Sequence, residues 1–292
     1  MNLNNLENKD VYLEVLASRE ENSNSIKISI LELLNDNMFR LVQSLKDSKV
    51  KLKYHHRELE GKYFRFGLGN QSMINLAKGN TSRILDIDTR IVDIFSVFSI
   101  SRMQIEAFAM SFYLFFEKID ENELNFRYDI YKIHGLTQQS KYDAAGEYGK
   151  KMKEKILIEL KETQSHMRDN SKVRDLTEKE RKRYMNPPFA KLLKTDDFME
   201  RSGLSKINFY AMWKLYSNHI HNEYISDRQY NTMYKINMSV EDELGINLTL
   251  MSCLTARLCD QLCLNFEVAK NKFESFDERS KIHHRIWGGL IG

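Results

Sequence analysis

The sequence contains few residues that interrupt helices. It has only two prolines, adjacent at Pro187 and Pro188, and 12 glycines among 292 residues. A sandwich or barrel of many short strands needs frequent turns, so this scarcity favours long helices instead. Strand-like alternation of apolar and polar residues is nearly absent as well. We therefore expect an all-α fold.

Cysteine is also scarce. The three cysteines, Cys253, Cys259 and Cys263, form no disulfide framework, which is typical of proteins from a reducing compartment. No His, Asp or Glu pattern completes a zinc site around them, so we expect small, buried, apolar side chains. The N-terminal residues lack a basic start followed by an apolar run, and we expect a cytoplasmic protein without a secretory signal.

Several common motifs are missing. The chain has no phosphate-binding P-loop, no G-x-G-x-x-G, no H-E-x-x-H, no C-x-x-C pair, no G-x-S-x-G and no EF-hand loop. These absences exclude most nucleotide-, metal- and serine-hydrolase classes, and we expect neither a metal nor a cofactor. The net charge of +3 excludes a generally polycationic nucleic-acid binder but allows a local basic face.

The segment 84–118 is the most apolar part of the chain. Its length would suit a membrane span. However, Asp93, Arg102 and Glu106 lie within it, and central charges are costly in lipid. A helix that is apolar nearly all round also fits the centre of a soluble bundle. We expect the latter, without membrane association.

The remaining pattern predicts the domain organisation. Apolar spacing predicts helices over 9–21 and 25–47, and the glycine-containing stretch from Gly67 to Gly79 is expected to break the helical run. We expect a helical extension over residues 1–80 and a bundle over 81–292. Within the bundle, helices are expected at 85–118, 121–143, 189–201, 205–224 and 240–273, and Gly203 is expected to end the 189–201 helix. Residues 150–186 form a charged insertion or arm that ends at Asn186-Pro-Pro.

Two predicted helices carry candidate chemistry. Arg102 and Glu106 are one turn apart on one face of the 85–118 helix, where buried charges must be paired. They are either a structural ion pair or the polar wall of a site. On the 205–224 helix, Lys214, Ser217 and His221 share a face. A lysine supplies positive charge and a histidine can transfer protons. Alternatively, His221 is a core histidine bonded to Glu106.

These two helices resemble a known group of proteins. SRMQIEAFAMSFYL (101–114) resembles the R-x-x-x-E helix of an uncharacterised bacterial all-helical family, and YAMWKLYSNHIHN (210–222) resembles its aromatic-x-x-x-Ser-x-x-x-His helix. That family is related to the HEPN superfamily (higher eukaryotes and prokaryotes nucleotide-binding), and the resemblance covers about residues 85–270. It implies a HEPN-like bundle, often dimeric, and metal-independent ribonuclease activity in toxin–antitoxin or antiviral defence systems.

The superfamily site has an arginine followed by four to six residues and a histidine. This sequence departs from that pattern, because Lys214 stands seven residues before His221 where an arginine is expected. A lysine cannot form the bidentate contact of an arginine, which puts catalysis in doubt. Arg127 and His134 match the spacing on another predicted helix and are the second-choice catalytic pair.

Basic stretches provide candidate contacts to RNA. Lysines and arginines could follow a phosphate backbone, and Tyr54, Tyr63 and Phe64 could stack on bases. The alternative is a solvated, charged helix face with ordinary core aromatics. The residues expected to bind RNA are Lys51, Lys53, Arg57, Lys150, Lys151, Arg181 and Arg183.

Together these patterns predict a polar pocket within an apolar core, where the 85–118 and 205–224 helices pack face to face. His221 would transfer protons, Lys214 and Arg102 would hold a phosphate, and Glu106 and Ser217 would orient them. We expect an RNA- or nucleotide-phosphate-acting protein, a homodimer, with an antitoxin or another defence component as protein partner. The alternative is a non-catalytic adaptor or immunity-type protein whose polar network is structural.

Overall fold

The computed structural model describes residues 6–20, 23–84, 87–174, 176–205, 209–220, 224–235 and 240–290. The chain divides into two compact units. The first unit comprises Met1–Lys51, Glu58–Ser111 and Met199–Gly292, and the second comprises Leu52–Arg57 and Phe112–Phe198. Over the described residues the structure is helical apart from one short two-stranded hairpin, which confirms the expected helical class.

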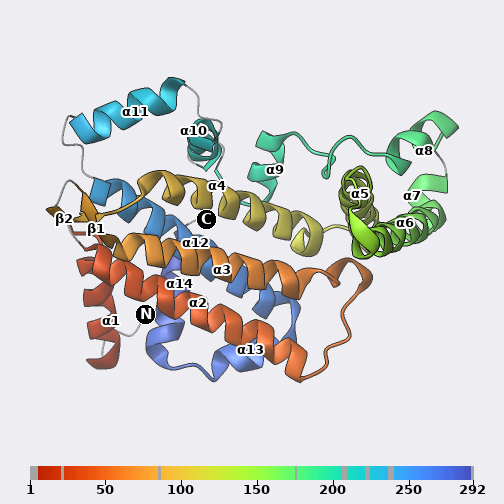
Figure 1. The fold of residues 1–292 in the computed structure, drawn as a ribbon. Helices are drawn as coiled ribbons and strands as arrows, with labels where there is room; N and C mark the ends of the chain where they lie inside the picture. Colours follow the sequence, from red (N-terminus) through yellow and green to blue (C-terminus); the bar gives the residue numbers. More distant parts are fainter. Residues whose placement is uncertain are drawn as a thin grey trace. The chain divides into compact units, whose positions relative to one another are not determined.

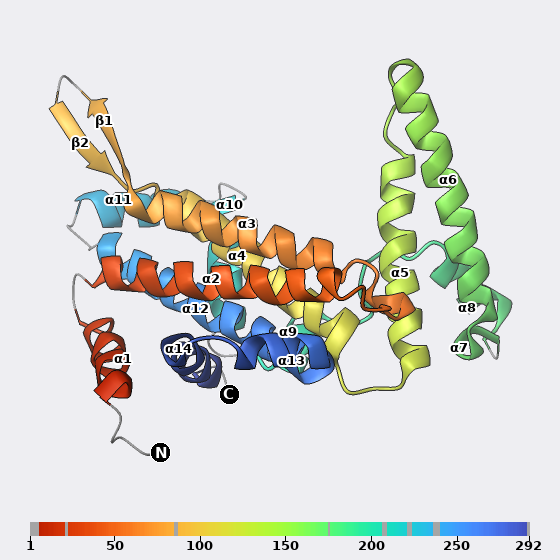
Figure 2. The ribbon, with the colours of Figure 1, turned by 90° about the horizontal axis from the view of Figure 1, so that it is seen from below.

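Four long helices form the centre of the first unit. They are α2 (Asn24–Asp47), α3 (Leu59–Lys78), α4 (Ile94–Ser111) and α12 (Val240–Asn265), and they lie side by side (Figures 1 and 2). In α2, the buried Leu34, Met38, Leu41 and Leu45 recur at spacings of three and four, as the sequence pattern predicted. Such spacing places apolar side chains on one face of a helix, so the bundle is held by burial of these faces.

Shorter helices cover this bundle. In the first unit, α1 (Leu6–Ala17) packs on α14 (Glu278–Gly289), while α14 and α13 (Glu267–Glu274) pack on α12 and α2. On another side α10 (Ala211–Ile220) packs on α4 and contacts α11 (Tyr224–Lys235). A further helix, α9 (Thr195–Arg201), ends just before Gly203, whose φ of 78° confirms the predicted stop.

A network of amides links the four central helices. The Asn70 side-chain nitrogen donates to Asn35 Oδ1 (3.1 Å) and to Thr255 Oγ1 (2.9 Å). The Gln104 side-chain nitrogen donates to Asn70 Oδ1 (2.9 Å) and to the Phe66 carbonyl oxygen (2.7 Å). All four polar side chains are buried and each comes from a different helix. Because an unpaired buried amide is costly, these bonds select one register of the bundle.

The division of the chain differs from the expected boundary at residue 80. Helices α2 and α3 are not an extension, since they supply half of the central bundle and α2 packs along α12. The N-terminal region therefore shares one apolar core with the C-terminal helices. The sequence pattern showed an amphipathic helix at 25–47 but not which helix would cover its apolar face.

The break predicted between Gly67 and Gly79 occurs only at the end of this stretch, where Gly79 (φ 72°) follows the last residue of α3. Helix α3 runs without interruption through Gly67 and Gly69. Both glycines lie where neighbouring side chains come close: an added Cβ at Gly69 would lie 2.8 Å from Gln104, and one at Gly67 would overlap Phe39. These two glycines allow the helices to pack closely. Their spacing along the chain does not distinguish such glycines from glycines that form a turn.

Two other predicted helices have different bounds. The antiparallel strands β1 (Asn80–Ile84) and β2 (Ile87–Ile91) occupy the start of the segment expected as helix 85–118, and α4 begins only at Ile94. The expected 240–273 helix divides at Phe266, whose extended backbone (φ −133°, ψ 113°) separates α12 from α13. The strand segment is rich in Thr and Ile, which suit an extended backbone.

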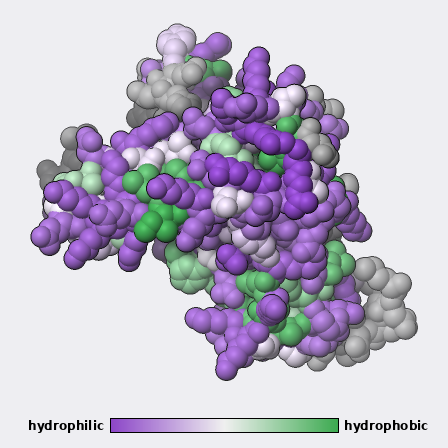
Figure 3. Space-filling view, turned by 90° about the vertical axis from the view of Figure 1, so that its right-hand side faces the viewer, coloured by the Kyte–Doolittle hydropathy of each residue, from purple (hydrophilic) through white to green (hydrophobic). Residues whose placement is uncertain are grey.

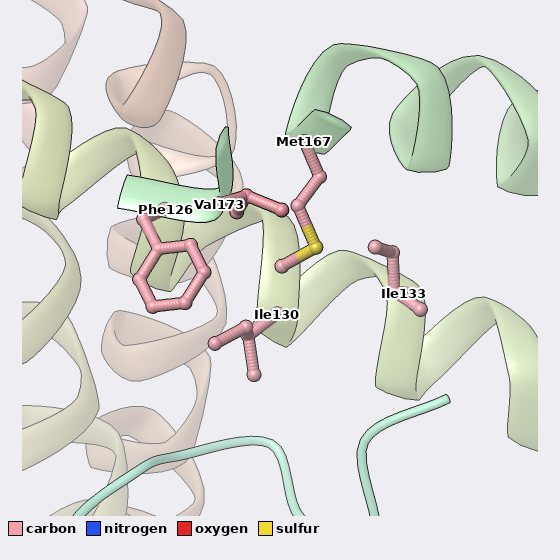
Figure 4. Close-up of a cluster of buried hydrophobic side chains, with 5 residues drawn as sticks. All are labelled: Phe126, Ile130, Ile133, Met167 and Val173. Atoms are coloured by element: carbon pink, nitrogen blue, oxygen red, sulfur yellow. The ribbon is translucent and has the colours of Figure 1, made fainter. Parts of the chain in front are cut away.

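The second unit is built on a pair of helices, α5 (Glu121–Ser140) and α6 (Gly146–Asp169). Two short helices follow, α7 (Ser171–Arg174) and α8 (Glu178–Met185), and α8 ends at the predicted Asn186-Pro-Pro break. A 3-10 turn, Tyr54–His56, and a π-helical segment, Phe112–Phe116, complete the unit. Its buried cluster comprises Phe126, Ile130, Ile133, Met167 and Val173 (Figure 4).

Helix α6 contains most of the predicted charged arm. Its buried residues are only Thr163 and Met167, so the rest of its surface meets solvent at least partly. This agrees with the expected exposed helix. No helix among the described residues is both long and apolar enough to cross a membrane.

The close approach at Gly69 predicts opposite effects of two Gly→Ala substitutions in α3. Gly69→Ala should reduce the free energy of unfolding by about 1–3 kcal/mol, because the new methyl group displaces Gln104 from its buried hydrogen bonds. Gly61→Ala is the control: nothing lies within 4 Å of its Cβ position, and better helix propensity should add about 0.5–1 kcal/mol. Urea unfolding measures both. A neutral or stabilising Gly69→Ala would contradict the packing argument.

A half-buried carboxyl on α12 predicts a pH dependence. Burial raises the pKa of Asp260 to about 6, and Arg257 opposes the shift. The folded state therefore binds the proton of Asp260 more tightly than the unfolded state does. As pH rises from about 4 to about 6, the contribution of Asp260 to the free energy of unfolding falls. Asp260→Asn should remove that slope, measured by urea unfolding across this range. The exposed Asp10→Asn is the control, and an unchanged slope in Asp260→Asn would refute the prediction.

Candidate functional site

The structure brings together part of the predicted site in the first unit. The Nε of Arg102 on α4 donates to Ser217 Oγ on α10 (2.8 Å), and a terminal nitrogen of Arg102 lies 3.3 Å from Glu106 Oε1. Trp213 Nε1 donates to the same Glu106 oxygen (2.9 Å). We call Arg102, Glu106, Trp213 and Ser217 the Arg102 cluster. Arg102 thus contacts both Glu106 and Ser217, as the sequence predicted, while the functional roles of these residues stay predictions.

Aromatic rings fix the two helices around this cluster. The Arg102 guanidinium carbon lies 5.1 Å from the Trp213 ring centre, and Tyr210 stacks on Trp213. Further along the same contact, Tyr216 stacks on Phe98 with ring centres 4.9 Å apart. Stacked rings and a cation over an indole each stabilise such a contact modestly. Together they give the Arg102 side chain a defined position.

The predicted burial of the cluster is wrong. The side chains of Arg102 and Glu106 are 21% and 40% exposed, so the cluster lies at the surface and not within the core. The buried polar residues of α4 are instead Ser101, Gln104 and Ser111, and Ser101 and Gln104 bond to residues of the central bundle. Because consecutive helical residues point about 100° apart, Arg102 cannot share the buried face of Ser101 and Gln104. Among the described residues, α10 supplies the contacts of Arg102 with another helix.

The two remaining predicted catalytic residues are Lys214 and His221. Lys214 on α10 is exposed, and His221 lies outside the described residues. The neighbouring His219 is described: its ring packs 5.3 Å from the Phe95 ring and 4.8 Å from the Phe98 ring. Burial lowers the pKa of His219, as expected for a histidine that helps to pack α10 on α4.

Arg127 and His134 have separate partners in the second unit. Arg127 is buried, donates to Glu123 Oε1 (2.8 Å), pairs with Glu117, and lies over the Tyr113 ring at 4.3 Å. His134 Nδ1 lies 3.0 Å from the Pro187 carbonyl oxygen. No hydrogen bond in the described part of the chain joins Arg127 to His134. Both therefore have structural contacts, and their catalytic role stays a prediction.

The residues expected to bind RNA are exposed, but their surroundings differ. Lys53 pairs with Glu121 (2.9 Å), and Arg181 Nε donates to the Val173 carbonyl oxygen (3.1 Å). The other basic residues named for RNA, which are also exposed, are Lys51, Arg57, Lys150, Lys151 and Arg183. The face drawn in Figure 3 is largely hydrophilic, with smaller hydrophobic areas between.

The three aromatic residues expected to stack on bases lie in three environments. Tyr63 is buried, and its hydroxyl donates to the Leu258 carbonyl oxygen (3.0 Å), so it is a core residue that no base can reach. Phe64 is 56% exposed. Tyr54 belongs to a second polar cluster that the sequence did not reveal.

This second cluster lies in the second unit and centres on a buried carboxylate. Asp129 on α5 is fully buried, with Tyr54 Oη donating to Oδ1 (2.6 Å) and His166 Nδ1 2.8 Å from Oδ2. The Tyr54 and His166 rings stack with centres 4.0 Å apart. Burial raises the pKa of Asp129, and the two hydrogen bonds oppose that shift. We call Tyr54, Asp129 and His166 the Asp129 cluster.

One signal for this cluster is present in the sequence. Asp129 lies between Phe126 and Ile130 on the apolar face of a predicted helix, where an acidic residue needs a partner. The partners are 75 residues before it and 37 residues after it, at distances along the chain that no spacing rule connects.

Comparisons with protein-family models, with curated proteins and with solved structures find no match to this chain. Among the described residues, no group of three or more His, Cys, Asp or Glu side chains is placed to hold a metal ion. The candidate sites are therefore interpreted from their own geometry.

The contacts of Arg127 predict that it stabilises the fold. Arg127→Ala would remove the buried cation that pairs with both Glu117 and Glu123, which are 14% and 20% exposed, and should cost about 3–5 kcal/mol in the free energy of unfolding, although Lys172 still lies 3.1 Å from Glu123. His134→Ala removes one hydrogen bond to a carbonyl and should cost about 1 kcal/mol. Urea unfolding compares the two. Equal losses, or a loss below 1 kcal/mol for Arg127→Ala, would contradict the structural assignment.

Proposed function

We propose that this protein acts on the phosphate groups of RNA or nucleotides without a metal ion, as a HEPN-like endoribonuclease of a bacterial defence or toxin system. The observation that carries the proposal is the Arg102 guanidinium. It is held by Ser217, Glu106 and Trp213 while its side chain stays 21% exposed. A preorganised, accessible arginine suits recognition of a phosphate.

The donors of Arg102 support this chemistry. A guanidinium has five N–H donors, and the contacts to Ser217 and Glu106 use two of them. The others have no hydrogen-bond partner in the described part of the chain and can donate to the oxygens of a phosphate. Lys214 is exposed one turn before Ser217 on α10 and would add positive charge beside it. Glu106 and Ser217 would orient the arginine.

The proton-transfer group of the proposal is His221. It follows Ser217 by four residues in the sequence and lies outside the described residues. The resemblance to the HEPN superfamily supports this role, a homodimer and a protein partner such as an antitoxin. Its histidine would take a proton from an attacking hydroxyl or give one to a leaving oxygen.

Cleavage of RNA in the presence of EDTA tests the proposal. Purified protein should cleave total RNA, and Arg102→Ala should slow cleavage by about 100-fold, because it removes a fixed cation from the developing charge. Arg102→Lys should recover only part of the activity, and His221→Ala should be inactive. The exposed Arg65→Ala, on α3, is the matched control and should cleave like wild type.

Two results would overturn this function. The first is the absence of cleavage by wild-type protein. The second is equal cleavage by the Arg102→Ala and His221→Ala variants and the wild type.

A second candidate function is a non-catalytic adaptor or immunity-type interaction protein. The observation that favours it is the mutual pairing within the Arg102 cluster, where Ser217, Glu106 and Trp213 all bond across two helices. In that case Arg102→Ala and Trp213→Phe would mainly lower the melting temperature, and no RNA cleavage would be lost with them.

A further inference from the structure

The second unit contains a cavity of about 630 Å³ beside the Asp129 cluster. Its wall includes Tyr54 and Arg57 at the 3-10 turn, Lys132 on α5, and Lys155, Glu162 and His166 on α6. The volume falls in the range of small-molecule sites. This cavity is separate from the Arg102 cluster, so the inference does not rest on the proposed function.

The buried carboxylate determines how His166 faces the cavity. Asp129 accepts a hydrogen bond from Tyr54, and an ionised carboxylate can only accept, so His166 Nδ1 carries the proton of the second bond. Nε2, on the other edge of the ring, then accepts a hydrogen bond in the neutral ring and donates one in the imidazolium, which is the form that donates to a phosphate oxygen. The His166 side chain is 44% exposed, and no described residue bonds to Nε2. This arrangement orients an imidazole toward a ligand, as a carboxylate does in acid–base sites.

An accessible arginine packs on the same tyrosine as this imidazole. The Arg57 guanidinium carbon is 4.8 Å from the Tyr54 ring centre, and the His166 ring stacks on that ring. Arg57 is exposed and has no ion pair among the described residues. Because both side chains also line the cavity, both can face one anionic group bound in it. An arginine fork with a neighbouring imidazole suits the oxygens of a phosphate.

The acidic residues of the cavity restrict what else the ligand carries. Glu159 Oε1 forms an ion pair with Lys132 Nζ at 2.8 Å. Glu162 lies one turn before His166 on α6 and has no hydrogen-bond or ion-pair partner in the described part of the chain, so it would repel a second anion. A carboxylate accepts hydrogen bonds, so a ligand with hydroxyl groups next to its phosphate fits this wall.

We propose that this cavity binds the phosphate monoester of a sugar, with Arg57 and His166 Nε2 on the phosphate and Glu162 on a sugar hydroxyl. Asp129 is a positioning residue that holds the imidazole. Lys155, earlier on α6, also lines the cavity and adds positive charge. Two sources share this chemistry: a free sugar phosphate and the 5′-phosphorylated end of an RNA chain.

Calorimetric titration with ribose 5-phosphate tests the proposal on the full chain. Arg57→Ala and His166→Gln should each weaken binding at least about tenfold. The first removes the hydrogen bonds of the guanidinium to the phosphate, and the second removes the hydrogen bond of the imidazole. Inorganic phosphate should bind more weakly than ribose 5-phosphate, and Glu162→Gln should reduce that preference. Arg168→Ala and Lys161→Ala, exposed on α6 and away from the cavity wall, are the controls and should bind like wild type.

Asp129→Asn gives a readout that a merely structural role would not produce. The amide should change the ring-nitrogen chemical shifts of His166 and weaken binding, while the circular dichroism of the second-unit helices stays unchanged. If Asp129→Asn unfolds the protein, the exposed variants Arg57→Ala and His166→Gln decide the matter alone.

Parallel titrations with 5′-phosphorylated and 5′-hydroxyl RNA hexamers distinguish the two sources. Tighter binding of the phosphorylated hexamer, lost in Arg57→Ala, would support an RNA end; binding of ribose 5-phosphate alone would support a free sugar phosphate. Absence of binding by every phosphate, or binding unchanged in both Arg57→Ala and His166→Gln, would overturn the proposal. Neither result depends on Arg102→Ala, so this inference and the proposed function fail independently.

Discussion

The first unit depends on one buried set of amide hydrogen bonds. Asn70 lies on α3, and its side chain hydrogen-bonds to Asn35 on α2, Thr255 on α12 and Gln104 on α4. Apolar packing alone tolerates small shifts of one helix along another, whereas an unpaired amide in the core costs the full desolvation of that group. The bonds therefore set the rotation of α4. This rotation sends Gln104 inward and leaves Arg102 on the side that α10 covers.

The second unit uses the same physical rule with a charge in place of an amide. Asp129 is buried by the apolar side chains of α5 and needs donors for both of its oxygens. Tyr54 and His166 supply them from two separate segments. One consequence is structural, since the carboxylate ties the 3-10 turn and α6 to α5. The other is chemical, since the same bond leaves one imidazole nitrogen for the cavity.

The two clusters differ in which of their hydrogen-bonding groups can still bind a ligand. In the Arg102 cluster each polar side chain bonds across the contact between α4 and α10, and only the spare donors of the guanidinium are available. In the Asp129 cluster the hydrogen bonds join Tyr54, Asp129 and His166 to one another. The second ring nitrogen of His166 and the guanidinium of Arg57 can therefore still bind a ligand. A polar group that is accessible and already fixed in position favours binding, because folding has already supplied the entropy cost of ordering its side chain.

The candidate site was predictable only where its residues lie close in sequence. Arg102 and Glu106 were found because one helical turn separates them, and Ser217 because it follows the aromatic pattern of its own helix. The Asp129 cluster was missed because its members come from three distant segments. The glycines of α3 were misinterpreted for a related reason: a glycine that lets helices approach and one that ends a helix look the same along the chain.

By itself the sequence determined the helical class, most helix positions, the stop at Gly203 and the break before the two prolines, because these follow from local spacing and backbone restrictions. Only the tertiary structure decided that α2 and α3 belong to the central bundle, that Arg102 is partly exposed at the surface, and that Asp129 meets Tyr54 and His166. Local patterns act over one or two turns, whereas burial and the pairing of distant polar groups depend on which faces meet when the whole chain packs.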